Sequence, residues 1–157
     1  MTTRYVTEVG KKKLEDELAE LKAKRNDIAR QIKEAREFGD LKENAEYAAA
    51  REAQNNLEIR VKEVEALLQN LTVFSYKTAN TSEVNLGTAV LVENVRTKKQ
   101  ETYVVTGFME FDIEKNYISN ESPKGNALLG KKVGEIAIIK TPVSQIELKI
   151  LKISHAE

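Results

Sequence analysis

The sequence contains no cysteine and no tryptophan, and only two prolines among 157 residues. The lack of cysteine excludes disulfides and thiolate metal sites and is typical of a reducing compartment. Net charge is also missing, because 25 basic residues balance 25 acidic ones. No bulk positive charge therefore indicates nucleic-acid binding, and any such role depends on local patches. No stretch approaches the ~20 apolar residues of a membrane span, and residues 1–13 contain no apolar run of signal-peptide type. We therefore expect a soluble, cytoplasmic protein.

The residues that are present divide the chain into two parts of different character. Before about residue 71 charges are dense and proline is absent, whereas Val, Ile, Thr and Tyr dominate after about residue 83. This change predicts a helix-rich segment followed by a strand-rich one. We place a first domain at residues 1–76, a linker at 77–82 and a second domain at 83–157.

Two narrow apolar seams, with steps of three and four residues, run through the first domain. Their members are Leu14, Leu18, Leu21, Ile28, Ile32 and Ala35, followed by Ala50, Leu57, Val61, Val64, Leu68 and Leu71. Such seams are typical of coiled coils. The two series pair symmetrically about Leu41, with Leu18 opposite Val64, which predicts an antiparallel hairpin. We expect helices from about Thr7 to Phe38 and from about Leu41 to Leu71, each spanning about 45 Å.

The second domain alternates apolar and polar residues in short runs. Four strands are predicted, at residues 88–95, 100–106, 135–140 and 145–153. Between them, Ser122 and Pro123 form the typical start of a helix, a capping hydroxyl followed by proline at the first helical position. Gly130 would end that helix. The sequence thus predicts an α+β protein, a helical hairpin followed by a small domain with a mainly antiparallel sheet.

The segment from Gly39 to Asn44 would lie at the tip of the hairpin. Asp40 and Glu43 have the spacing of a capping box, which would only start the second helix. The same spacing also presents two carboxylates in one direction, and hard oxygen ligands suit Mg²⁺. Two acids are too few to hold a metal alone, but they could complete a site whose other ligands belong to a partner. The two interpretations are compatible.

Several cations surround this tip, namely Arg30, Lys33, Arg36, Lys42 and Arg51. They could form pairs within a helix, such as Arg30 with Glu34 and Lys33 with Glu37. They could instead form a basic track for a phosphate backbone. The residues alone leave both interpretations open.

The run from Glu34 to Glu52, EAREFGDLKENAEYAAARE, closely resembles the signature of bacterial Gre transcript cleavage factors of the GreA type. Shorter matches follow in order along nearly the whole chain, at residues 7–10, 14–18, 118–119, 122–123, 127–131 and 140–142. The resemblance implies a coiled-coil N-terminal domain and a C-terminal domain of FKBP-like fold. It also implies binding to bacterial RNA polymerase, with the C-terminal domain at the rim of the secondary channel and the coiled coil inside it.

The resemblance assigns roles to the tip acids. Asp40 and Glu43 would stabilise a second Mg²⁺, shared with the polymerase active site, and orient the attacking water. The polymerase would itself cleave backtracked nascent RNA, so the chain would be an accessory factor with no cofactor of its own. We expect it to act as a monomer, away from membranes.

The resemblance also suggests roles for polar residues outside the acid pair. Arg36, Lys42 and Arg51 would contact the nascent RNA near its 3′ end. Ser122 and Pro123 would lie near the polymerase-docking surface.

One departure from the family pattern lies at residues 143–144, where Val-Ser replaces a common glycine pair. We expect that hairpin to be rebuilt, because valine resists positive φ. Three other functions are alternatives: an inhibitory paralogue that blocks the channel, a prolyl isomerase or chaperone with a coiled-coil arm, and a plain coiled-coil scaffold. The intact acid pair argues against the first. The second domain contains no tryptophan that could form the floor of an isomerase pocket, which argues against the second. The tip signature argues against the third.

Overall fold

The structure, a computed structural model, describes residues 3–39 and 44–156. Its contacts divide the chain into two compact units, one formed by Met1–Gly10 with Leu71–Glu157 and the other by Lys11–Asn70. The N-terminal residues belong to the first unit because β1 (Arg4–Val6) pairs in parallel with β2 (Leu71–Val73). The domain limits expected at residues 76 and 83 stay a prediction, and residues 77–82 contain no helix or strand.

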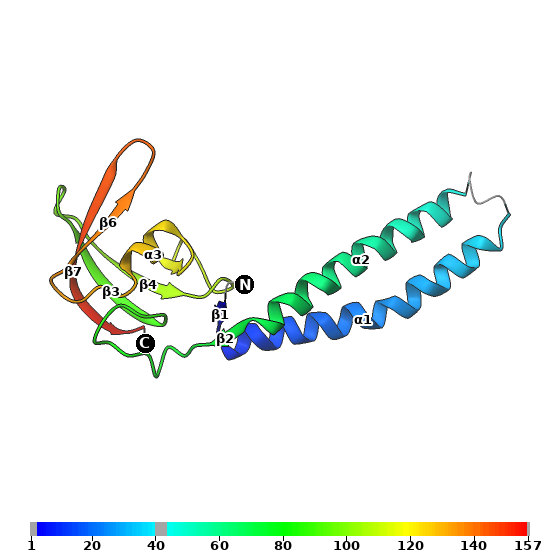
Figure 1. The fold of residues 1–157 in the computed structure, drawn as a ribbon, viewed down its shortest axis with the longest axis horizontal. Helices are drawn as coiled ribbons and strands as arrows, with labels where there is room; N and C mark the ends of the chain where they lie inside the picture. Colours follow the sequence, from blue (N-terminus) through cyan, green and yellow to red (C-terminus); the bar gives the residue numbers. More distant parts are fainter. Residues whose placement is uncertain (1–2, 40–43, 157) are drawn as a thin grey trace. The chain divides into compact units, whose positions relative to one another are not determined.

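The helical unit is the predicted hairpin, formed by α1 (Glu8–Arg36) and α2 (Ala45–Gln69) (Figure 1). Among the described residues of this unit, every buried apolar side chain belongs to one of the two predicted seams, namely Leu14, Ile32, Ala35, Ala50, Leu57, Val61 and Val64. The predicted helix start near Leu41 is wrong. The second helix begins at Ala45, and Asn44 rather than Asp40 is its N-cap residue.

Ion pairs cross between the two helices. They are Glu17–Arg60, Arg25–Glu58 and Lys22–Glu65. The first two are bidentate, with nitrogen–oxygen distances between 2.7 and 2.9 Å. Bidentate geometry distinguishes them from ordinary surface pairs, which contribute little to stability. The first and third pairs lie on either side of the predicted contact between Leu18 and Val64, in agreement with the antiparallel arrangement.

The pair between Glu17 and Arg60 predicts a pH-dependent stability. Hydrogen bonds from Arg60 hold the pKa of Glu17 below its usual 4.5. A lowered folded-state pKa stabilises the protein above the unfolded value, and this contribution disappears as pH falls through the folded value. We expect Glu17→Gln to lower the melting temperature by about 2 °C at pH 7 and by less at pH 3, where more of Glu17 is protonated.

Circular dichroism melting of the full chain at both pH values measures this difference. Glu20→Gln is the matched control, since Glu20 is exposed on the same helix and outside the three pairs. An equal loss for Glu17→Gln at both pH values would show that the ion pair is not the cause.

The second unit contains a five-stranded sheet in the order β5-β4-β3-β7-β6, with one short helix (Figure 1). The elements are β3 (Thr88–Asn94), β4 (Gln100–Thr106), β5 (Tyr117–Ser119), α3 (Pro123–Leu128), β6 (Ile136–Lys140) and β7 (Gln145–His155). All strand pairs in it are antiparallel except β4 with β5. The α+β fold class and all four predicted strands are confirmed, while the three-residue strands β1, β2 and β5 were missed.

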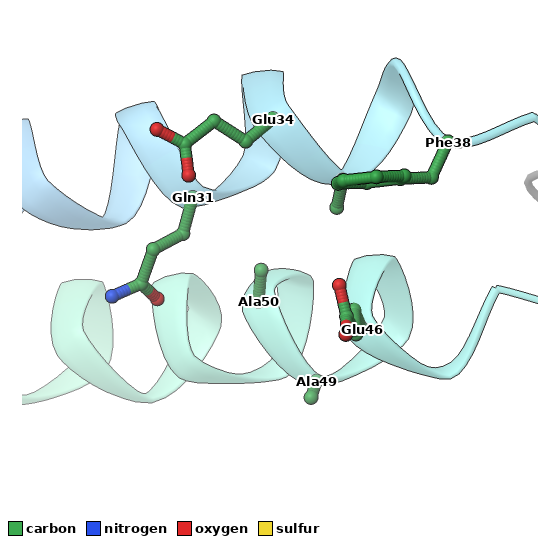
Figure 2. Close-up of a pocket in the computed structure, with 7 residues that line it drawn as sticks. Gln31, Glu34, Phe38, Glu46, Ala49 and Ala50 are labelled. Carbon is green, nitrogen blue, oxygen red and sulfur yellow. The ribbon is translucent and has the colours of Figure 1, made fainter.

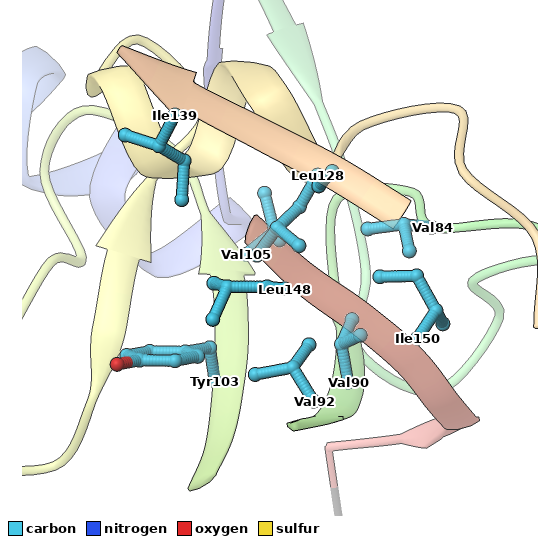
Figure 3. Packing of buried hydrophobic residues seen from close by; sticks show 10 residues of the cluster. Val84, Val90, Val92, Tyr103, Val105, Leu128, Ile139, Leu148 and Ile150 are labelled. Carbon is cyan, nitrogen blue, oxygen red and sulfur yellow. The ribbon is translucent and has the colours of Figure 1, made fainter. Parts of the chain in front are cut away.

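One face of this sheet carries the hydrophobic core, where side chains from four strands and α3 converge (Figure 3). The alternation predicts the arrangement, because Val90 and Val92 on β3 are buried whereas Leu91 between them is only partly so. Leu128 of α3 packs into this core and has no exposed surface. The helix position is therefore fixed by packing as well as by its cap.

The loop that departs from the family pattern is a short turn between β6 and β7. The backbone N–H of Thr141 donates to the carbonyl of Ser144 at 2.8 Å, and the N–H of Ser144 donates to Thr141 Oγ1 at 2.9 Å. Among the described non-glycine residues, only Lys98 and Asn116 have positive φ. Val143 thus makes the turn without the left-handed backbone that a glycine would supply.

Candidate functional site

The end of α1 brings the chain to the tip. Two short-range hydrogen bonds tighten its last turn, from the N–H of Glu37 to Glu34 O and from that of Phe38 to Ala35 O, each 3.2 Å long. Gly39 then has φ of +105°, a conformation that residues with a Cβ rarely adopt. Such a left-handed glycine is the usual residue just after the end of a helix, so Gly39 closes α1.

Asn44 connects the two helices at the other end of the tip segment. Its side-chain Oδ1 accepts hydrogen bonds from the N–H groups of Glu46 and Tyr47 at 3.0 and 3.1 Å, which caps α2. Its Nδ2 donates to the carbonyl of Ala35 in the last turn of α1 at 2.6 Å. One side chain therefore satisfies orphan groups of both helix ends. Sequence reasoning gave Asn44 no role, although asparagine is among the strongest N-cap residues.

Three of the predicted tip residues, Asp40, Lys42 and Glu43, lie outside the described residues. The structure therefore gives the two anchors on either side of them, Gly39 and Asn44. Within residues 3–39 and 44–156, no group of three or more His, Cys, Asp or Glu side chains could hold a metal ion. The predicted metal role of the two acids stays a prediction.

The described cations near the tip are solvent-exposed. The guanidinium of Arg36 lies 5.9 Å from the centroid of the Tyr47 ring, across the hairpin. Arg51 donates from Nη1 to Gln54 Oε1 at 3.2 Å, within its own helix. Neither arginine forms an ion pair with a described residue, so both charges remain available to an external anion.

Arg30 does form an ion pair, but with a different partner from the one considered. It contacts Asp27 at 3.0 Å instead of Glu34, because a three-residue spacing also places two side chains on one helix face. The suggested pair of Lys33 with Glu37 is not among the ion pairs of the described residues. Pairing within a helix thus accounts for Arg30 but not for the other described cations.

Ser122 and Pro123 occupy the positions predicted for them at the start of α3. Ser122 Oγ accepts the N–H of Gly125 at 3.1 Å and donates to Ser119 O at 2.6 Å. Pro123 is exposed at the first turn. Their local geometry is fully explained by helix capping, and whether they also dock a partner stays a prediction.

Neighbouring charges that the sequence did not single out surround this helix start. Glu121 accepts two hydrogen bonds from Arg4, at 2.9 and 3.0 Å, and the Arg4 guanidinium lies 4.2 Å from the centroid of the Phe108 ring. Lys124 donates to the hydroxyl of Tyr103 at 3.0 Å. Burial, followed by the hydrogen bond to Glu101, raises the pKa of that hydroxyl to about 12, so it stays protonated near neutral pH.

Comparison with known proteins covers both units. Two family models match, one described as transcription elongation factor, N-terminal, at residues 4–73, and one as transcription elongation factor, GreA/GreB, C-term, at residues 79–155. In the part of the chain that the structure describes, no helix combines the length and the apolar character needed to cross a bilayer.

The chain is also similar to individual proteins along nearly its whole length. A transcription elongation factor GreA of Amoebophilus asiaticus is 45% identical over 96% of each chain. Another, from Caldanaerobacter subterraneus, is 44% identical over 94% of this chain and 95% of that one. The crystal structure of GreA factor homolog 1 (Gfh1) protein of Thermus thermophilus is 22% identical, covers 97% of this chain and 99% of its own, and gives a TM-score of 0.44. From the two family models and the full-length relatives, this chain belongs to the GreA/GreB family of transcription elongation factors.

Proposed function

We propose that this protein enters the secondary channel of bacterial RNA polymerase and stimulates the polymerase's own cleavage of backtracked nascent RNA. The observation that carries the proposal is family membership over both units, combined with an intact acid pair, Asp40 and Glu43, at the hairpin tip. The hairpin supports a role that depends on reach, because helices of 29 and 25 residues extend about 40 Å at 1.5 Å per residue. The protein would act in the cytoplasm as a monomer.

The chemistry of Asp40 and Glu43 fits a shared metal ion. Mg²⁺ prefers oxygen ligands and often takes only one or two protein carboxylates. In two-metal phosphodiester cleavage the ions lie about 3.5–4 Å apart and stabilise the attacking and leaving oxygens. The two carboxylates of this chain would add ligands to an ion that the polymerase holds weakly, and would orient water beside it. The protein would have no hydrolytic activity of its own.

The exposed arginines at the tip would bind the RNA. Arg36 and Arg51, together with Lys42, would contact phosphates near the 3′ end of the extruded transcript. Ser122 and Pro123, exposed or half-exposed at the start of α3, would lie near the surface that docks on the polymerase.

A transcript cleavage assay on a stalled, backtracked polymerase complex tests the proposal. We expect the protein to accelerate release of a short 3′ RNA fragment and to restore elongation. Binding without acceleration would instead favour a channel-blocking inhibitor. Accelerated proline isomerisation in a peptide assay, with no effect on cleavage, would favour an isomerase.

The basic track gives a separate prediction. We expect Arg36→Glu and Arg51→Glu each to lower stimulated cleavage about fivefold while changing polymerase affinity less than twofold, since each removes a charge that contacts RNA phosphate. Lys24→Glu, an exposed change farther down α1, is the control. Unchanged cleavage in both arginine variants would show that these side chains are only solvated surface.

A further inference from the structure

A cavity of about 340 Å³ lies between α1 and α2 near the tip, and we call it the notch (Figure 2). Leucine and valine fill the space between the helices farther from the tip, whereas three alanines, Ala35, Ala49 and Ala50, line the notch. Their small side chains leave the space open. Its volume is at the lower end of the range for ligand pockets, about 300–1,000 Å³, and suits a single side chain.

Phe38 forms one wall of the notch and is unusually exposed. The residue is 77% accessible to solvent, although a polar residue could have occupied this position just after α1. Figure 2 shows the ring lying along the gap, with a face directed toward α2. The flat face of an aromatic ring is electronegative and attracts cations. The ring therefore provides a stacking surface that nothing in the described residues covers.

Two carboxylates accompany this ring. Glu34 and Glu46 both line the notch, and neither forms an ion pair with a described residue. Figure 2 shows the Glu46 carboxylate on α2, across the gap from the Phe38 ring. Glu46 also lies in the first turn of α2, where a negative charge interacts favourably with the helix dipole. That local effect explains an acid at this position but not its juxtaposition with an exposed aromatic ring.

The described basic residues near the tip do not line the notch. Arg36 instead lies beside the Tyr47 ring of α2, and Arg51 donates to Gln54 within its own helix. Phosphates brought to the notch would be repelled by both carboxylates.

We infer that the notch binds an arginine side chain of a partner protein, with the guanidinium between the Phe38 ring and the Glu46 carboxylate. A guanidinium is planar and weakly hydrated, so it can stack on a ring and donate two hydrogen bonds to one carboxylate. An ammonium group is not planar and does not present two parallel N–H donors to one carboxylate. If the protein has the proposed function, this arginine lies on the wall of the polymerase channel.

The first experiment needs no polymerase. The full chain, with ¹³C-labelled phenylalanine, is titrated with hexaarginine, hexalysine and hexauridylate while the ring resonances are followed by NMR. We expect hexaarginine to shift the Phe38 resonances at concentrations about fivefold lower than hexalysine, and Glu46→Gln to weaken this about fivefold. The rings of Phe74 and Phe108 serve as internal controls.

Three results of this titration would overturn the inference. Equal effects of hexaarginine and hexalysine would show that the notch only attracts cations in general through its acidic charge. A Phe38 shift caused by hexauridylate would identify it as a nucleobase site, and no shift with hexaarginine would exclude it as an arginine site.

The second experiment measures competition for polymerase by full-length variants. We expect Phe38→Leu and Glu46→Gln each to weaken binding about fivefold, and the double variant to lose less than the product, because both remove contacts to one guanidinium. Glu20→Gln makes the same charge change on α1, outside the notch, and should bind normally. Wild-type protein that fails to bind polymerase would defeat the proposed function, while the NMR titration would still decide the inference. Normal binding by both notch variants would remove the polymerase as the source of the arginine.

Discussion

Asp40→Asn and Glu43→Gln are each expected to reduce stimulated RNA cleavage at least tenfold, while leaving polymerase binding within about twofold of wild type. Each substitution keeps the size of the side chain but removes an anionic oxygen, and Mg²⁺ favours carboxylate oxygens over amides. Losses of about 10- to 100-fold are typical when even an outer ligand of a metal site is changed. Cleavage of a backtracked complex at several Mg²⁺ concentrations measures the effect.

The position of the helix cap sharpens this test. Had Asp40 capped the second helix, Asn would have replaced it at little cost, since the two residues cap equally well. The cap is Asn44, so the stability of α2 gives no reason for Asp40→Asn to fail. Extra Mg²⁺ should partly restore a variant that has lost one ligand, and should not restore one that has lost docking. Full cleavage by Asp40→Asn at ordinary Mg²⁺ would contradict the proposed mechanism.

Periodic features of the fold were predictable from the sequence because each is repeated many times. The apolar steps run from residue 14 to 35 and from residue 50 to 71, about six turns each, so one polar residue in a seam does not hide the pattern. The alternation in β3 and β7 and the Ser122 cap of α3 were predictable because each can be recognised within a short stretch of sequence. The pairing of β1 with β2 was not predictable in this way. It joins two three-residue strands far apart in sequence, and neither is long enough to show a period.

The tip was predicted less well because two start signals compete within five residues. Asp40 with Glu43 has the spacing of a capping box, and Asn44 is an equally good cap for a helix that begins one turn later. Pattern alone cannot rank them. The structure favours Asn44, whose amide also reaches Ala35 O in the other helix, a contact that depends on tertiary packing.

That second contact makes Asn44 the positioning residue with the largest expected effect outside the acid pair. Asn44→Ala removes a helix cap and a cross-helix hydrogen bond, each contributing about 1 kcal/mol. We expect the hairpin to melt about 5 °C lower. Because the residue holds one end of the segment that carries Asp40 and Glu43, cleavage should fall about tenfold, since small misplacements of catalytic groups are costly.

Asn44→Asp separates the two contacts of this side chain. Aspartate keeps the acceptor that caps α2, and its charge suits a helix N-terminus, so the melting temperature should fall less than in the alanine variant. It cannot donate to Ala35 O, however, and places a carboxylate oxygen against that carbonyl. We therefore expect cleavage to fall as far with aspartate as with alanine. Circular dichroism melting and the cleavage assay, run on the same two variants, separate stability from positioning. Wild-type cleavage by Asn44→Asp would show that the cap alone matters and that the bridge to α1 does not position the acids.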